Sequence, residues 1–220
     1  LAALQLGVLA SMIETLALRD RMTARHSAAV ARYARAMARA LGWSREEEEL
    51  VHTAALLHDI GKFAFPDSIL LADSQLTDAQ WEQVKRHPED GAGIVRRIDG
   101  YGPVAEVVLA HHERWDGSGY PRGLAGEAIP KPARLIAVAD TYDVMTARDS
   151  YRKPISPQEA IAELRRVAGH QLDPEVVDVF VGLLTAGDLS FRHGDDADFE
   201  AELGFRHRVR AHAQPLPRSR

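Results

Sequence analysis

Apolar residues recur at three- and four-residue spacing along most of this chain, and this period constrains its fold more than any other feature. Tyr33, Met37 and Leu41 lie on one such stripe, and Gly42 follows as a natural helix end. No segment shows the polar and apolar alternation of a half-buried strand, and no internal repeat is visible. The sequence therefore predicts an all-α fold, a bundle of helices around a shared core.

Capping residues and prolines indicate where the helices begin. Ser44 and Glu47 form a capping-box pattern for a helix that runs toward Asp59 and is closed by Gly61. Residues 116–132 contain Gly and Pro repeatedly and lack a helical period, which predicts a loop. Further helix starts are expected at Thr77, Pro88, Pro103, Ala133, Ser156 with Glu159, and Asp173-Pro174, the last of these helices ending near Leu184.

The two ends of the chain differ from its middle. Residues 1–18 are apolar but contain Gln5 and Glu14, so we expect an amphipathic helix leading from an upstream domain rather than a membrane span. Residues 185–220 carry an acidic run and then a basic run, which is typical of a charged extension with little core. We expect one folded domain over residues 19–184. No secretory leader is visible, so we expect a cytoplasmic protein.

Composition limits the chemistry that the chain can support. There is no Cys, so disulfides and thiolate metal sites are excluded, and any metal must bind His and carboxylates. Such ligands suit iron, manganese or zinc. A net charge of −5 argues against a nucleic-acid polymer as partner, but not against a phosphate substrate at a metal site.

His58-Asp59, at the end of an apolar helical run, offers a neutral nitrogen and an anionic oxygen to one point. One such pair is weak evidence, but a histidine pair also opens the uninterrupted string His111 to Pro121, which reads HHERWDGSGYP. Asp140 ends the apolar run IAVAD, and a buried carboxylate must be paired or bound. Further candidate ligands are His26 and His87.

A helical bundle that brings these ligands together can hold two metal ions close to each other. Asp59 is the natural bridging ligand, because a carboxylate has two oxygens. His111 and His112 point about 100° apart on a helix, so both reach one site best at a helix end. Taken singly, His26 and His87 are also consistent with surface residues.

Two residues outside this ligand set have both a structural and a functional interpretation. Lys62 either favours the end of the helix dipole or meets a substrate phosphate. Tyr120 either anchors its loop or stacks on a base. The other histidines, to which we assign no metal, are His52, His170, His193, His207 and His212.

These motifs resemble the HD-GYP family, a branch of the HD phosphohydrolase superfamily, over roughly residues 19–184. The long string is specific, since a plain HD phosphohydrolase would lack it. The resemblance rests on Arg19-Asp20 with Thr23 and His26, on His58-Asp59-Ile60-Gly61-Lys62, on His87-Pro88-Glu89, on His111 to Pro121, on Gly123-Leu124 with Gly126, on Ile129-Pro130, and on Asp140-Thr141-Tyr142-Asp143.

The resemblance implies an all-helical fold of the HD-domain type, with extra helices and a Gly/Pro-rich loop. It also implies a cluster of two or three metal ions, often iron or manganese, and hydrolysis of the bacterial second messenger cyclic di-GMP to pGpG or on to GMP. Asp59 and Lys62 would be catalytic, with Lys62 on the scissile phosphate, and Tyr120 would shape the substrate and partner surface. The implied metal ligands are His26, His58, Asp59, His87, His111, His112 and Asp140.

The chain departs from the family pattern at two positions. Met22 stands where some members have a Glu that binds a third metal, so we expect two divalent ions. Asp149 stands where many members have an Arg that helps to hold substrate phosphate. Arg148 or Arg152 then substitutes in substrate binding, or binding is weaker.

The resemblance favours a metal-dependent cyclic di-GMP phosphodiesterase that acts as a bacterial signalling output domain. One alternative keeps the chemistry and changes the substrate to another cyclic dinucleotide or a nucleotide. A second alternative is a catalytically poor, metal-containing module that senses cyclic di-GMP or binds a partner. Such a partner would be a diguanylate cyclase or another signalling protein that contacts the Gly119-Tyr120-Pro121 loop. A homodimer is also compatible with the sequence.

Overall fold

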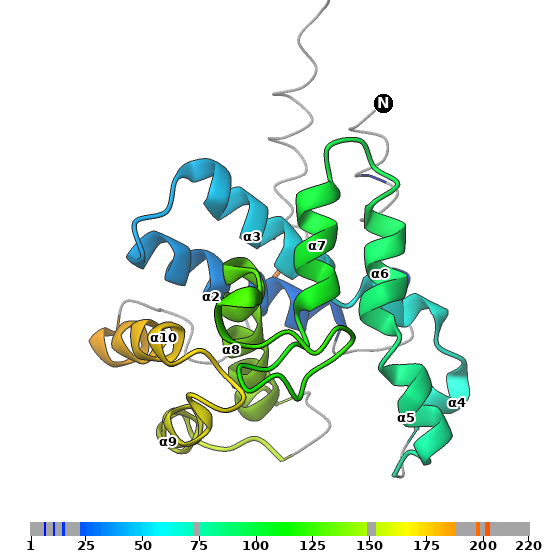
Figure 1. Ribbon diagram of the computed structural model, residues 1–220. Helices are drawn as coiled ribbons and strands as arrows, with labels where there is room; N and C mark the ends of the chain where they lie inside the picture. The colour runs from blue at the N-terminus through cyan, green and yellow to red at the C-terminus, as the bar shows by residue number, and fades with distance from the viewer. Residues whose placement is uncertain are drawn as a thin grey trace, which may run out of the picture.

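The computed structural model describes residues 23–72, 75–148, 153–187, 197–198 and 201–202, together with residues 7, 11 and 15. Helices follow one another through these ranges, and the one β contact found in them is an isolated bridge between Ala168 and Leu172. The all-α prediction is confirmed (Figure 1). The elements are α2 (Thr23–Ala40), α3 (Arg45–Leu57), η1 (Ile60–Ala64), α4 (Asp67–Leu70), α5 (Asp78–Val84), α6 (His87–Val95), α7 (Gly102–Ala110), η2 (Gly126–Ala128), α8 (Lys131–Thr146), α9 (Pro157–Val167) and α10 (Pro174–Ala186).

The core forms where α2 packs on α3 and α8, its two most extensive helix partners. Tyr33 of α2, Tyr142 of α8 and Phe180 of α10 are fully buried and meet edge to face, with ring centroids 5.2–5.5 Å apart. Such aromatic pairs add to the free energy gained by burying their area. They lock together three helices that are far apart in the sequence, and α2 and α8 carry candidate ligands.

The predicted helix starts are confirmed where capping chemistry decides them. Ser44 and Glu47 form both hydrogen bonds of a capping box, as do Ser156 with Glu159 at α9. One predicted boundary is wrong, because α8 begins at Lys131 and includes Pro132 in its first turn. A proline is well tolerated there, since the first turn of a helix needs no backbone N–H donor.

Gly61 does not close α3, as the sequence suggested, because the helix already ends at Leu57. Gly61 lies in η1, where a Cβ atom would overlap the backbone carbonyl of His87. Gly91 of α6 faces it, and its own Cβ would lie 3.1 Å from the Gly61 nitrogen. The missing side chains thus let η1 approach α6 closely, which brings His58-Asp59 to the start of α6.

Two smaller contacts complete the described fold. Phe65, Ile69 and Leu70 form a separate small core beside α5, which Figure 1 shows with α4 at the lower end of α6. Glu202, in the expected C-terminal extension, accepts a hydrogen bond from Arg32 and lies 3.0 Å from Nε2 of the buried His52. This part of the extension therefore docks on α2 and α3. Within residues 188–220, the structure describes 197–198 and 201–202.

The described residues of the N-terminal segment, 7, 11 and 15, are helical, and the remainder of the expected helix over residues 1–18 lies outside the description. Among the described residues, no helix is both long enough and apolar enough to cross a membrane.

Candidate metal centre

The His58-Asp59 pair lies in the turn that leaves α3, between Leu57 and Ile60, and both side chains are buried. Nδ1 of His58 lies 2.7 Å from the carbonyl oxygen of Ala55. Because a carbonyl oxygen can only accept, Nδ1 must donate. The ring therefore turns Nε2, and its lone pair in the neutral form, toward the other candidate ligands.

His87 and His111 are held in the same way. Nδ1 of His87 lies 2.7 Å from the carbonyl of Val84, and Nδ1 of His111 lies 2.6 Å from that of Val108. Their Nε2 atoms meet at 3.1 Å. Two ring nitrogens at that distance need a proton or a cation between or beside them, because two lone pairs would repel each other.

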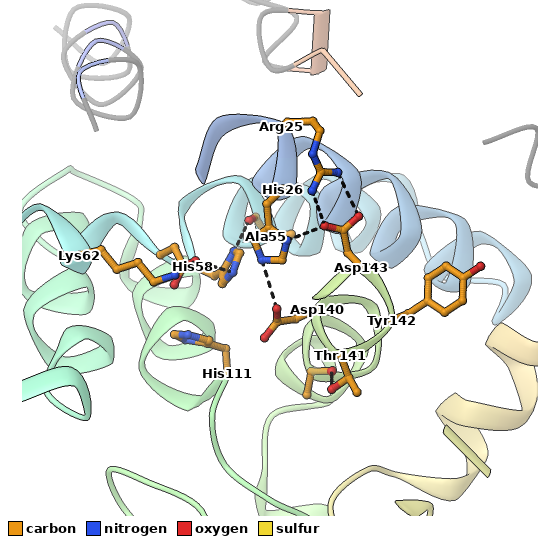
Figure 2. Close-up of polar contacts among 12 residues, drawn as sticks. Arg25, His26, Ala55, His58, Lys62, His111, Asp140, Thr141, Tyr142 and Asp143 are labelled. Carbon is orange, nitrogen blue, oxygen red and sulfur yellow. Dashed lines mark hydrogen bonds and ion pairs between the residues drawn. The ribbon is translucent and has the colours of Figure 1, made fainter. Parts of the chain in front are cut away.

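His26 differs from these histidines, because its Nδ1 faces a carboxylate instead of a backbone carbonyl. Oδ2 of Asp143 lies 2.7 Å from this nitrogen, and the same carboxylate accepts two hydrogen bonds from Arg25, of 2.9 and 3.2 Å. Figure 2 shows Asp143 between Arg25 and His26. On its other side, Nε2 of His26 lies 3.1 Å from Oδ1 of Asp140.

The candidate ligands gather into two groups, each with ligand atoms within 4.8 Å of one another. We call them the His87 group (His87, His111 and His112) and the His26 group (His26, His58 and Asp140). Helices α6 and α7 present the first group, and helices α2, α3 and α8 present the second. Residues that are up to 114 positions apart in the sequence thus converge on one region of the bundle.

Asp59 belongs to neither group but lies between them. Its Oδ1 is 3.4 Å from Nε2 of His87, and its Oδ2 is 3.4 Å from Nε2 of His58. Nζ of Lys62 lies 2.7 Å from Oδ2. Burial alone would raise the pKa of Asp59, but Lys62 and His58 outweigh it and hold that pKa well below its usual range. One carboxylate oxygen therefore faces each group, and both are anionic.

Burial and neighbouring charges give the two groups different proton affinities. Burial, assisted by the His87 charge, lowers the pKa of His112 to about 3, and burial with the His112 charge puts the pKa of His111 well below its usual value. Burial opposes protonation of His26 too, but hydrogen bonds to Asp140 and Asp143 outweigh it and raise its pKa to about 10. The His87 group thus offers neutral nitrogens, whereas His26 holds a proton between two carboxylates.

This donor set fits divalent metal ions. It combines imidazole nitrogens with the carboxylates of Asp59 and Asp140, and the chain contains no Cys. His26, His58, His87 and His111 each have an ordered partner for Nδ1. Nitrogen and oxygen donors of this kind suit iron, manganese and zinc. The close approach of uncharged His87 and His111 nitrogens is an arrangement that a bound cation would stabilise.

The Gly/Pro-rich loop after α7 is anchored by Glu113, a residue for which we expected no separate role. Glu113 is 4% exposed, and its carboxylate accepts hydrogen bonds of 2.7 and 2.9 Å from the backbone nitrogens of Arg122 and Leu124. The backbone nitrogen of Tyr120 donates to the His112 carbonyl at 3.2 Å, and the two rings pack with centroids 5.0 Å apart. Tyr120 therefore lies against a candidate ligand.

Sequence reasoning also missed the role of Asp143, although the last acidic residue of the motif Asp140-Thr141-Tyr142-Asp143 was a signal. It lies one helical turn after Asp140, so both carboxylates reach His26 from the same face of α8. Arg148 is exposed just after α8 ends. Arg152, Asp149 and Met22 lie outside the described residues, so their predicted roles stay predictions.

Comparison with known proteins supports the resemblance. Residues 10–176 match the family model described as the HD domain. A cyclic di-GMP phosphodiesterase of Thermotoga maritima is 38% identical over 193 residues, which cover 86% of this chain and 52% of that protein. A 3'3'-cGAMP-specific phosphodiesterase of Vibrio cholerae is 37% identical over 164 residues, or 74% of this chain and 38% of that protein. The chain thus spans about half the length of the first relative and 38% of the second.

A solved structure has the same fold. An HDGYP protein of Bdellovibrio bacteriovorus superimposes with a TM-score of 0.59 at 23% identity, over 73% of this chain and 51% of that one. At that sequence identity, the structural similarity is evidence for the fold alone. It confirms the predicted helical bundle. The family match and the relatives confirm the recognised family: this chain belongs to the HD domain family, in its HD-GYP branch.

Proposed function

We propose that this chain is a metal-dependent phosphodiesterase that hydrolyses cyclic di-GMP to pGpG, to GMP, or to both. The observation that carries the proposal is the position of Asp59, with one oxygen toward the His87 group, the other toward the His26 group, and Lys62 beside it. We further propose that residues 19–184 form the phosphohydrolase domain, and that it acts as a bacterial signalling output domain.

The proposed cofactor is a pair of divalent ions, iron or manganese, with zinc also compatible. The His87 group and the His26 group would each hold one ion, and Asp59 would bridge them. When bound, such ions stabilise negative charge on phosphoryl oxygens and make water a stronger nucleophile at neutral pH. That chemistry suits phosphodiester hydrolysis, in which water adds to phosphorus and the bond to the 3' oxygen breaks.

The chain's own side chains would bind and orient the substrate. Lys62 is 20% exposed, and its ammonium lies beside Asp59, where it would stabilise charge on the scissile phosphate. Tyr120 would shape the surface next to His112, toward the substrate or toward a partner such as a diguanylate cyclase. Arg148 and Arg152 would contact a substrate phosphate in place of the Arg that Asp149 replaces.

A second candidate substrate is a mixed cyclic dinucleotide. It is favoured by the relative of Vibrio cholerae that is named as 3'3'-cGAMP-specific and is 37% identical. The reaction and the metal centre would be the same, so the two candidates differ only in how the bases are recognised.

The test is product formation by purified, metal-loaded protein from cyclic di-GMP, 3'3'-cGAMP and cyclic di-AMP, followed by chromatography. We expect pGpG or GMP from cyclic di-GMP. Asp59→Ala should abolish turnover and lower metal content, because it removes the carboxylate whose two oxygens face the two groups. Asp99→Ala, an exposed acid between α6 and α7, is the matched control. Full turnover by Asp59→Ala would contradict the proposal.

A further inference from the structure

A cavity of about 330 Å³, open to solvent on one side, lies beside the candidate metal centre, between the chain that follows η1 and the α5–α6 region. Ala64, Phe65 and Pro66 line one side of it, and Gln83, Arg86 and Asp90 line the other. None of these residues belongs to the ligand set described above. The cavity is therefore a feature that the metal chemistry leaves unexplained.

The cavity adjoins the centre through two of its walls. The Phe65 ring packs edge-on against the ring of His87, with centroids 6.0 Å apart, and Phe65 is 8% exposed. Ala64 follows Lys62 by two residues in η1, and Arg86 directly precedes His87. The cavity thus borders His87 and the segment of chain that carries Lys62.

The polar wall carries two opposite charges on successive turns of one helix. The backbone nitrogen of Asp90 donates to the carbonyl of Arg86 at 3.0 Å, so the two side chains share a face of α6. Within the described part of the chain, neither side chain takes part in an ion pair. The amide of Gln83 lies on the same wall. The cavity therefore offers donors, acceptors and an aromatic edge together.

The size of the cavity limits what it can take. Ligand pockets commonly have volumes of about 300–1,000 Å³, so this one lies at the lower end of the range. It suits one planar ring system. Arg86 and Asp90 also match the hydrogen-bonding groups of guanine better than those of adenine.

Guanine presents two acceptors, N7 and O6, next to two donors, the N1–H and the N2 amino group. Arg86 can donate to N7 and O6, as Arg commonly does, and the carboxylate of Asp90 can accept from N1 and N2. Adenine has an acceptor at N1, which would face the carboxylate and repel it. A carboxylate beside an arginine thus discriminates between the two purines.

We propose that this cavity binds a guanine base, with Asp90 and Arg86 as the residues that determine specificity and Phe65 as its aromatic wall. That the guanine belongs to the substrate rests on the proposed function. The chain would then prefer a guanine nucleotide over an adenine nucleotide.

The test measures binding of GMP and AMP to the metal-loaded chain by calorimetry, since a phosphodiesterase cleaves neither. We expect the native chain to bind GMP more tightly. Asp90→Asn and Arg86→Gln should each weaken GMP binding by about 5- to 150-fold, the range for one bidentate base contact, and should affect AMP little. Elemental analysis should show unchanged metal content in both variants, which shows that the centre is intact.

Glu89→Gln is the matched control, because Glu89 is exposed on the same turn of α6 and does not line the cavity. Equal affinity of the native chain for GMP and AMP would overturn the proposal. It would also be overturned if the ratio of GMP affinity to AMP affinity were unchanged in both variants. Turnover of cyclic di-GMP is measured separately. If the native chain prefers GMP but cleaves no cyclic dinucleotide, the guanine site is supported and the proposed function is contradicted.

Discussion

At the scale of single residues, Asp143 determines how His26 is presented. Its carboxylate accepts from Nδ1 of His26 at 2.7 Å, and Arg25 holds that carboxylate with two further hydrogen bonds. Asp143 is fully buried, so it has little freedom to turn away. A carboxylate behind a histidine fixes the ring and makes its other nitrogen a better ligand.

Asp143→Asn should therefore weaken metal binding at the His26 group and spare the His87 group. Loss of such a partner typically costs about 10- to 100-fold in metal affinity. Metal titration with elemental analysis would show one tight and one weakened site. Asp173→Asn is the control, because Asp173 is also buried and pairs with an arginine, Arg134, at 2.7 Å. Unchanged affinity at both groups would contradict this role for Asp143.

The proton on His26 makes metal binding depend on pH. Its pKa is raised to about 10, so without metal it is protonated at neutral pH, and an ion must displace that proton. His112, with a pKa of about 3, is already neutral. Affinity at the His26 group should thus rise with pH up to about 10, while the His87 group changes little near neutrality.

Calorimetry in buffers with different ionisation enthalpies would measure this proton. We expect release of about one proton when the His26 group fills and almost none when the His87 group fills. Filling of both groups with no proton release would show that His26 is neutral before the metal binds.

At the scale of secondary-structure elements, the ends of helices supply most of the candidate centre. His58 and Asp59 follow α3, His87 begins α6, and His111 and His112 follow the last residue of α7. Helix ends allow adjacent side chains to reach one point, which the middle of a helix does not. The loop after α7 then folds back so that Tyr120 covers His112.

Tyr120→Ala tests what this loop does. Tyr120 is half-buried and is not among the candidate metal ligands, so we expect unchanged metal content and weaker substrate binding. If the ring stacks on a base, the loss should be about 1–3 kcal/mol in substrate affinity, and Tyr120→Phe should restore most of it. Equilibrium binding of cyclic di-GMP to both variants measures this.

Two other outcomes would change the role of Tyr120. Loss of metal in Tyr120→Ala would mean that the ring holds His112 in place. Normal affinity for cyclic di-GMP with lost binding to a diguanylate cyclase would mean that the loop is a protein-interaction surface.

At the scale of the whole molecule, local chemistry made the helix order predictable. The capping pairs at Ser44 and Ser156 act within three residues, so the sequence displays them directly. The purpose of Gly61 could not be predicted, because it depends on His87, a residue brought close only by folding. The short helix α4 was not predicted either, since its stability comes from packing of Ile69 and Leu70 in the small core.

In the candidate site, too, local features could be predicted from the sequence, whereas contacts between distant residues could not. Residue type and motif were enough to name the seven candidate ligands, six of which the structure places in two compact groups with Asp59 between them. The partners that orient those ligands were not predictable. The bond between Asp143 and His26 joins residues 117 positions apart, and that between Glu113 and the loop backbone depends on how the loop folds.

The decisive measurement is the rate of cyclic di-GMP cleavage by one protein preparation before metal removal, after chelation and dialysis, and after Mn²⁺ or Fe²⁺ is restored. We expect release of pGpG or GMP at first, no release from the stripped protein, and recovery when the metal returns. Cleavage that survives complete removal of metal, or no cleavage by protein that holds its metals, would contradict it.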